Sequence, residues 1–162
     1  MTQADQAKTS LAAVGISHGP VIAALHGICF DGTVDAAWDD KAVTELLAMP
    51  GAFAFVASQR GQPIGFVLAR QAADEGEIIN IGIVPDARRQ GIAGLLLDAV
   101  IEKVACDGGQ QIFLEVAADN AAALAVYSGR NFQICGRRAG YYRRPDGVVD
   151  ARILVRQIGS GK

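Results

Sequence analysis

Between an apolar run and a stretch of helical periodicity, the chain carries Arg88-Arg89-Gln90-Gly91-Ile92-Ala93-Gly94. The preceding residues 78–84 predict a buried strand, and residues 95–105 repeat apolar side chains at a helical period. The first N–H groups of such a helix have no internal partner and carry partial positive charge. The small residues at positions 91, 93 and 94 would let a phosphate approach the main chain. We therefore predict an anion-binding site at the start of this helix.

The pattern on either side of this loop predicts an α/β fold. We expect strands at 11–16, 52–57, 63–70, 77–84, 111–116, 132–140 and 151–157, and helices at 20–30, 39–48, about 91–106 and 120–128. The strand–helix–strand unit around the loop implies a right-handed crossover and a parallel pair, whereas the earlier strands form a hairpin turned at 59–62. The predicted architecture is a mixed central sheet with helices on both faces. Residues 1–162 form one domain in this interpretation, with 1–9 and 159–162 loose.

Composition excludes several classes of function. The chain is 51% hydrophobic and 20% charged, which is typical of a globular protein. A net charge of −2 argues against direct nucleic-acid binding, and no apolar run is long enough to span a membrane. The polar start of the chain lacks the apolar core of an export signal, so we expect a cytoplasmic protein. The three cysteines, Cys29, Cys106 and Cys135, form no CxxC pair, which predicts inert buried thiols, no disulfide framework and no metal site.

Glu115 stands out because the strand around it, residues 112–116, is otherwise apolar. Such a strand is expected to be covered on both faces. A carboxylate at this position either has a partner or faces a cleft, where desolvation would raise its pKa and make it a base near neutral pH. The alternative is a carboxylate that reaches solvent or pairs with an arginine, and the strand position alone does not decide between them.

The helix after this strand offers a second polar pair. Asp119 and Asn120 are both suited to cap its first turn. Tyr127 lies two helical turns beyond Asn120 on the same face, where a tyrosine usually belongs to the core. Its phenol, with a reference pKa near 10, can alternatively give a proton to a leaving thiolate.

Together these stretches resemble the GNAT superfamily of N-acetyltransferases. The order Arg-x-x-Gly-x-Ala in residues 88–93 is similar to the pyrophosphate loop of that superfamily. The string from Leu114 to Phe132, with Glu115, Asn120 and Tyr127 in place, resembles the branch of bacterial ribosomal-protein-alanine N-acetyltransferases. The later pairs Arg137-Arg138 and Tyr141-Tyr142 resemble the carboxyl-terminal segment of that branch. The likeness covers residues 77–155.

The resemblance implies a role for each matching position. The backbone of Ile81, Gly82 and Ile83 would hold the acetyl carbonyl and the pantetheine arm of acetyl-CoA. The loop residues would bind the pyrophosphate, namely Arg88, Arg89, Gln90, Gly91, Ile92, Ala93 and Gly94. Glu115 would be the general base, Tyr127 the general acid, and Asn120 a contact to CoA. No metal is implied.

Two positions depart from the superfamily pattern. Asn131 precedes Phe132 where glycine is usual, and we expect the turn to survive because asparagine tolerates left-handed backbone. Ala93 replaces a common glycine and slightly narrows the approach to the phosphate.

The implied reaction is direct attack of an amine on the thioester in a ternary complex. Cys106 and Cys135 have no histidine near them in sequence, and His18 and His26 are interpreted as structural, so an acyl-enzyme is not supported. An α-amine (pKa about 8) loses its proton more readily than lysine (about 10.4), a difference of roughly 3.4 kcal/mol. The implied acceptor is a protein N-terminus, such as the terminal alanine of a small-subunit ribosomal protein. Trp38, Arg137, Arg138, Tyr141 and Tyr142 are candidates for its groove, although Trp38 could equally be core and the arginines a solvated face. A small-molecule amine acetyltransferase and a non-catalytic acyl-CoA-binding module remain as alternatives.

Overall fold

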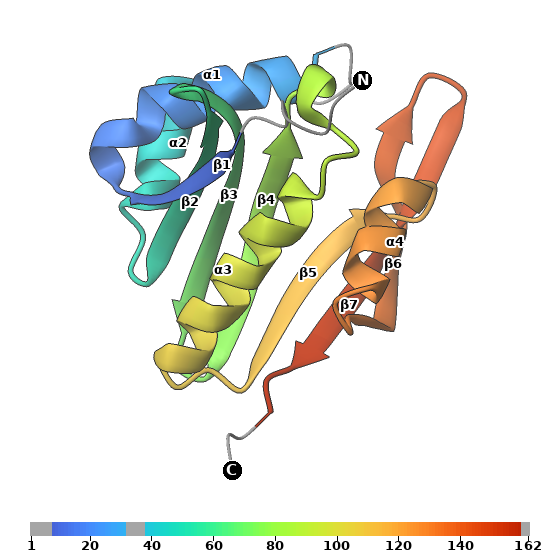
Figure 1. Cartoon of the computed structure of the whole chain (residues 1–162). Helices are drawn as coiled ribbons and strands as arrows, with labels where there is room; N and C mark the ends of the chain where they lie inside the picture. Colours follow the sequence, from blue (N-terminus) through green and yellow to red (C-terminus); the bar gives the residue numbers. More distant parts are fainter. Residues whose placement is uncertain (1–7, 32–37, 160–162) are drawn as a thin grey trace, which may run out of the picture.

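Strands and helices follow one another in a mixed order over residues 8–31 and 38–159, which the computed structural model describes. Figure 1 shows the arrangement. The elements of these residues are β1 (Thr9–Val14), η1 (Ile16–His18, a 3-10 helix), α1 (Gly19–Cys29), α2 (Asp40–Leu47), β2 (Ala52–Gln59), β3 (Gln62–Ala72), β4 (Glu75–Ile83), η2 (Pro85–Ala87, also 3-10), α3 (Ile92–Cys106), β5 (Gln111–Ala117), α4 (Ala121–Ser128), β6 (Gln133–Arg144) and β7 (Gly147–Gln157).

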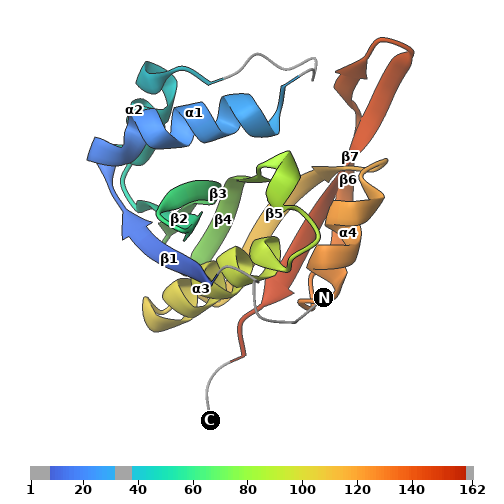
Figure 2. The same cartoon turned by 45° about the horizontal axis from the view of Figure 1, so that its top comes forward.

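The described strands form one sheet in the order β1-β2-β3-β4-β5-β7-β6. Only β4 and β5 pair in parallel, as expected for strands joined by the crossover helix α3. The other neighbours are antiparallel. Helices α1 and α2 lie on one face of the sheet, and α3 and α4 lie on the other (Figure 2). The predicted α/β class with a mixed sheet and helices on both faces is therefore confirmed.

Each face of the sheet carries its own hydrophobic core. On the α3 face, Leu96, Val100 and Val104 of α3 are buried against strand residues that include Val67 and Ile112. On the α1 face, Ile22 and Leu25 are among the residues that pack with Phe66 and Leu68. Because successive strand residues point to opposite faces, the continuous apolar run in β3 supplies both cores.

Local turn chemistry decides several of the boundaries. The β2–β3 hairpin closes through Arg60 (φ 51°) and Gly61 (φ 76°), the left-handed pair that suits a two-residue turn. Gly108 (φ 81°) follows the end of α3, and Asn131 (φ 63°) takes the left-handed turn after α4, as expected from the sequence. Asp39 caps α2 by accepting a hydrogen bond from the Ala42 amide at 2.8 Å.

The two ends of the sheet differ from the sequence prediction. The first strand begins at Thr9 rather than residue 11, so Thr9, which belongs to the predicted loose leader, already pairs with Gln59 of β2. Residues 1–7 and 160–162 of the predicted loose ends lie outside the described residues. At the other edge, β6 and β7 continue well beyond their predicted bounds as a long hairpin (Figure 1). Both faces of its tip carry exposed polar residues, so the apolar alternation used for prediction is missing there.

Candidate active site

A gap in the strand pairing lies at the centre of the sheet. β4 and β5 pair only through Glu75–Gln111, Gly76–Ile112 and Glu77–Phe113, although both strands continue beyond these residues. Toward their carboxyl ends the two strands diverge (Figure 1). The second half of β4 therefore pairs with β3 alone and presents backbone N–H and C=O groups toward the gap.

A bulge shapes this free edge of β4. The register with β3 shifts between Leu68 and Ala69, which leaves Ile79 without a direct partner. After the bulge, Asn80 to Ile83 pair with Leu68 to Gly65, and these include the predicted cofactor residues Ile81, Gly82 and Ile83. A bulge twists a strand and re-aims the residues that follow it. The predicted residues thus lie on the edge that borders the gap.

Gly82 is required by packing on the α1 face. A Cβ at this position would lie 2.9 Å from Phe66 Cε1 and 3.0 Å from both Cβ and Sγ of Cys29. Phe66 is fully buried and Cys29 nearly so, which leaves neither free to move aside. The glycine lets α1 approach β4 closely beside the gap.

We expect Gly82→Ala to lower the free energy of unfolding by about 1–3 kcal/mol, the usual cost of an overpacked core. Thermal or urea unfolding would measure it. Gly27→Ala in α1 is the matched control, because nothing lies within 4 Å of its added Cβ and alanine favours a helix. Equal stability of the two variants would contradict the packing argument.

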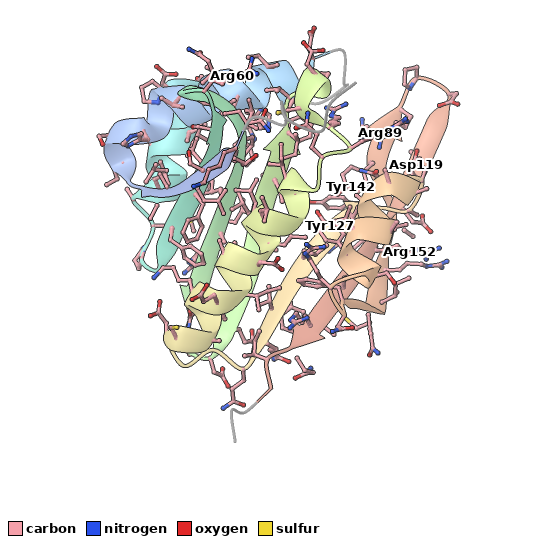
Figure 3. The ribbon with its side chains drawn as sticks, viewed as in Figure 1. Arg60, Arg89, Asp119, Tyr127, Tyr142 and Arg152 are labelled. Carbon is pink, nitrogen blue, oxygen red and sulfur yellow. The ribbon has the colours of Figure 1, made fainter. Side chains whose placement is uncertain are left out.

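The loop before α3 exposes its main chain as predicted. Arg89 (φ 64°) and Gly91 (φ 77°) both adopt left-handed backbone, and Gly91 is the N-cap of α3. Gly91 has no side chain, and among the described residues no side-chain cap hydrogen bond is found at this N-cap. Figure 3 shows Arg89 on the side of the loop that faces the β6–β7 hairpin. Uncapped amides at a helix N-terminus are suited to a diphosphate.

Two side chains of the loop are engaged by the protein itself. Arg88 donates through Nε to the Ile83 carbonyl at 3.0 Å and through Nη2 to the Cys29 carbonyl at 3.1 Å. It therefore ties the end of β4 to the last turn of α1, where a cation is favourable. Gln90 accepts a hydrogen bond from Gln59 Nε2 at 3.0 Å. For both residues, the predicted contact to a pyrophosphate would come from the backbone.

Gly94 has a neighbour that the sequence did not suggest. The three terminal atoms of the Arg130 guanidinium would all lie within 2.8 Å of a Cβ added at Gly94. Arg130 Nε donates to the Gly94 carbonyl at 3.1 Å and lies 3.1 Å from Asp98 Oδ1. The absent side chain at position 94 thus makes room for an arginine, rather than for a phosphate.

Glu115 faces the side of the sheet that carries α1 and α2. Its neighbours Leu114 and Val116 point into the α3-side core, whereas Glu115 is 29% exposed in its side chain. The expectation of a strand covered on both faces was wrong, because no helix of the described residues covers this part of the α1 face. Of the alternatives that the sequence left open for this carboxylate, the structure shows the pair with an arginine. Arg138 Nε lies 2.7 Å from Glu115 Oε1.

Tyr127 lies on the opposite side, in the α3-side core. It is 7% exposed and stacks edge-to-face with Phe132 at 5.8 Å. Burial, together with the nearby Tyr142, raises the pKa of the Tyr127 phenol to about 12. Figure 3 shows Tyr127 and Tyr142 close together, between α3 and the strands that follow it. The phenol is therefore protonated across the neutral range.

Asn120 is the N-cap of α4, which confirms one of the two capping residues expected there. Its Oδ1 accepts a hydrogen bond from the Ala123 amide at 3.1 Å. Capping uses only the oxygen, so the Nδ2 group is the part that could contact CoA. Asp119 lies 3.6 Å from Arg144 Nη2, an ion pair that joins the start of α4 to the hairpin.

The predicted acceptor residues do not gather in one place, and Tyr142 lies near Tyr127 (Figure 3). Trp38 stacks on the buried His26 with ring centroids 4.5 Å apart, and it packs with the α1 core. Arg138 and Tyr141 lie together near Glu115, with the guanidinium 5.7 Å from the ring centroid. Arg137 pairs with Asp150 at 3.6 Å. Of these candidates, Arg138 alone is in contact with Glu115 among the pairs described.

The cysteines depart from the expectation of three buried thiols. Cys29 is buried, whereas Cys106 and Cys135 are exposed. Burial raises the pKa of the Cys29 thiol to about 11, although the Arg88 guanidinium acts in the opposite direction. We expect a disulfide-exchange reagent at pH 8 to modify two thiols rapidly and the third only on unfolding, as peptide mapping would check. Modification of Cys29 at the same rate as the others would contradict its burial.

Within the described parts of the chain, no group of three or more metal-binding side chains gathers in one place. No helix there is long and apolar enough to cross a membrane. The candidate site consists of the open strand edge, the first turn of α3, Glu115 and Tyr127.

Comparison with known proteins agrees with this geometry. The family model of the GNAT acetyltransferases matches residues 22–132. A [Ribosomal protein bS18]-alanine N-acetyltransferase of Escherichia coli (strain K12) is 36% identical over 104 residues, which are 64% of this chain and 70% of the relative. The N-alpha-acetyltransferase RimI of Mycobacterium tuberculosis is 33% identical over 129 residues, 77% of this chain and 78% of the relative.

A solved structure extends the likeness to nearly the whole chain. The crystal structure of the ribosomal-protein-S18-alanine N-acetyltransferase from Escherichia coli matches with a TM-score of 0.86 and 26% identity. The match covers 96% of this chain and 97% of that chain. The chain is thus an N-acetyltransferase that uses acetyl-CoA. The family model matches residues 22–132, and the mixed sheet agrees with it. This protein therefore belongs to the GNAT family of acetyltransferases.

Proposed function

We propose that this enzyme acetylates the N-terminal α-amine of a protein by direct attack in a ternary complex, with Glu115 as base and Tyr127 as the hydrogen-bond donor to the departing sulfur. One observation carries the proposal. Glu115 and Tyr127 belong to opposite faces of the sheet, on β5 and on the helix that follows it, beside a gap that separates β5 from β4. Two substrates can therefore approach the same gap from opposite faces.

The residues around the gap fit the proposed mode of acetyl-CoA binding. The uncapped first turn of α3, with left-handed Arg89 and Gly91 before it, offers amides to the diphosphate. The unpaired edge of β4 at Ile81 to Ile83 offers peptide groups to the amide-bearing pantetheine arm and to the acetyl carbonyl. Acetyl-CoA supplies the thioester whose acetyl group is transferred and whose thiolate leaves.

Glu115 is the proposed proton acceptor for the incoming ammonium. Its side chain is on the acceptor side of the sheet, and the Arg138 ion pair holds the carboxylate in place. Arg138 is 57% exposed, so it can turn toward solvent or substrate at little cost. When the ammonium approaches, it replaces the guanidinium as the cation beside Glu115 and then gives up its proton there, directly or through a water molecule.

Tyr127 is the proposed donor to the departing sulfur. A thiol has a reference pKa near 8.5, so complete transfer from a phenol with a pKa of about 12 would be uphill by roughly 5 kcal/mol. We therefore assign Tyr127 a hydrogen bond that strengthens as negative charge develops on sulfur. Because burial keeps the phenol protonated, this donor is present throughout the neutral range.

The acceptor class follows from the chemistry of a single base. A carboxylate deprotonates an α-amine, with a pKa of about 8, far more readily than a lysine side chain. The names of the relatives support a protein N-terminus as the acceptor. Two of these names specify an alanine of a ribosomal protein. We infer that the terminal alanine of a small-subunit ribosomal protein is the first acceptor to test.

Intact-mass analysis tests the proposal. The enzyme is incubated with acetyl-CoA and peptides that differ only in a free or blocked N-terminus, and a gain of one acetyl group is expected only on the free terminus. Equal acetylation of the blocked peptide through lysine would contradict the α-amine assignment. Turnover restricted to polyamines, amino acids or aminoglycosides would instead identify a small-molecule enzyme. CoA binding without any turnover would identify a binding module.

A further inference from the structure

The first turn of α3 and the end of α4 are joined across the diverging part of the sheet by Arg130. α3 follows β4, and α4 follows β5, so each helix belongs to one side of the gap. The hydrogen-bonded pairs between the two strands are confined to residues 75–77 and 111–113, far from the carboxyl ends where the gap is widest. A contact between the helices near the open end therefore bears on the width of the gap.

The Arg130 side chain makes three interactions with α3. Nε donates to the Gly94 carbonyl at 3.1 Å and lies 3.1 Å from Asp98 Oδ1, and Nη2 lies 3.4 Å from Asp98 Oδ2. The guanidinium also lies against Gly94, in the space that any larger residue would fill. We call Arg130, Gly94 and Asp98 the helix clasp.

The other end of Arg130 is held by its backbone. Its amide donates to the Tyr127 carbonyl at 3.0 Å, and its own carbonyl accepts a hydrogen bond from Arg156 Nη1 of β7. Asn131 then takes the left-handed turn that leads into β6. The clasp thus connects the turn that carries Tyr127 to the turn of α3 that presents amides toward the diphosphate.

We propose that Arg130 is a positioning residue of the cofactor site, and that the helix clasp fixes the first turn of α3 relative to α4 and Tyr127. This inference rests on the proposed function, because it assumes that these amides bind the CoA diphosphate. The ion pair itself is worth little to global stability, since Arg130 and Asp98 are 31% and 59% exposed. Positioning matters more, because a binding group that is already held in place does not have to be ordered when the ligand binds.

Two single substitutions release the clasp by different routes. Arg130→Ala removes the guanidinium, and Gly94→Ala expels it while leaving Arg130 in the chain. We expect each to raise the Kd for CoA and the KM for acetyl-CoA by about 5–10-fold, with kcat at saturation and the KM for the acceptor within about twofold of wild type. If the role of Arg130 were purely structural, the substitutions would lower Tm but would not raise the KM for acetyl-CoA selectively over the KM for the acceptor.

The double variant is the decisive measurement. Once Arg130 is alanine, a methyl group at position 94 has nothing to expel, so Arg130→Ala/Gly94→Ala should bind CoA no more weakly than Arg130→Ala alone. Isothermal titration calorimetry gives the affinity for CoA of the wild type, of each single variant and of the double variant. Thermal unfolding confirms that each variant is folded. Arg143→Ala, an exposed arginine on β6, is the matched control and should leave CoA affinity unchanged.

The outcomes separate this inference from the function on which it rests. Wild-type protein that fails to bind CoA overturns the proposed cofactor site itself. Wild-type binding with both single variants unchanged, or with penalties that simply add in the double variant, overturns the clasp alone. Weaker binding in both single variants without further loss in the double variant supports it.

Discussion

Glu115→Gln is expected to lower kcat for acetyl transfer by about 10²–10³-fold at pH 7, the usual range for loss of a general base. Glutamine keeps the size of the side chain but cannot accept the ammonium proton. Because the carboxylate lies on the face of the sheet opposite Tyr127 and the α3-side core, the KM for acetyl-CoA should change little. Steady-state kinetics with a free-N-terminal peptide would measure both constants.

The pH dependence makes this prediction sharper. Above about pH 8, solvent deprotonates an α-amine without help from the enzyme. The deficit of Glu115→Gln should therefore shrink as the pH rises from 6 to 9. A deficit that is constant over this interval would mean that Glu115 does something other than accept the ammonium proton.

Matched variants separate catalysis from stability. Glu102→Gln replaces an exposed carboxylate on α3 and should leave kcat unchanged. Loss of the partly exposed pair with Arg138 should cost Glu115→Gln less than about 1 kcal/mol of stability. If Glu115→Gln were fully active, the assignment of the base would be wrong, whatever its stability.

Tyr127→Phe is expected to lower kcat by about 10²-fold, since it deletes the hydrogen bond to the departing sulfur. Phenylalanine keeps the edge-to-face contact with Phe132 and the packing of α4. CoA affinity should therefore be retained, as calorimetry would show. A variant that loses CoA binding in proportion to activity would indicate a packing role alone.

The raised pKa of Tyr127 also predicts how the enzyme responds to alkali. The folded pKa is about 12, above the reference value near 10, so the protonated phenol favours the folded state. This contribution is fully present below pH 10 and is lost as the pH rises through about 12. We expect wild-type stability to fall over that window more steeply than that of Tyr127→Phe, in chemical unfolding at fixed temperature. Parallel curves would contradict the burial argument.

Local patterns were sufficient to predict the elements around the loop at 88–94. The apolar run at 78–84 and the helical period at 95–105 predict a strand, a loop and a helix, and the structure places β4, η2 and α3 there. Asn131 was expected to hold a left-handed turn, and its φ of 63° confirms this. Such features depend on backbone sterics and periodicity within a few residues, which the sequence states directly.

The sequence was less informative where both faces of a strand are polar. β6 and β7 extend further than predicted, because in the added part Tyr142, Arg143 and Arg144 of β6 pair with Val149, Val148 and Gly147 of β7 without the apolar alternation used for prediction. Glu115 was placed in a doubly covered strand, yet its face of β5 is open. Whether this face of β5 is covered depends on where helices α1 and α2 lie. The residues near Glu115 in the sequence do not predict the positions of these helices.

The amino-acid sequence by itself determined the order of elements, the uncapped helix at residue 92 and the residue types that acetyl transfer requires. Only the tertiary structure decided that Glu115 pairs with Arg138, that Tyr127 lies on the opposite face, and that Arg130 fills the space left by Gly94. Local structure follows from steric and periodic rules that act within a few residues. These two contacts and the placement of Tyr127 involve residues that are distant in the chain or lie on opposite faces of the sheet, and the folded sheet alone brings them together.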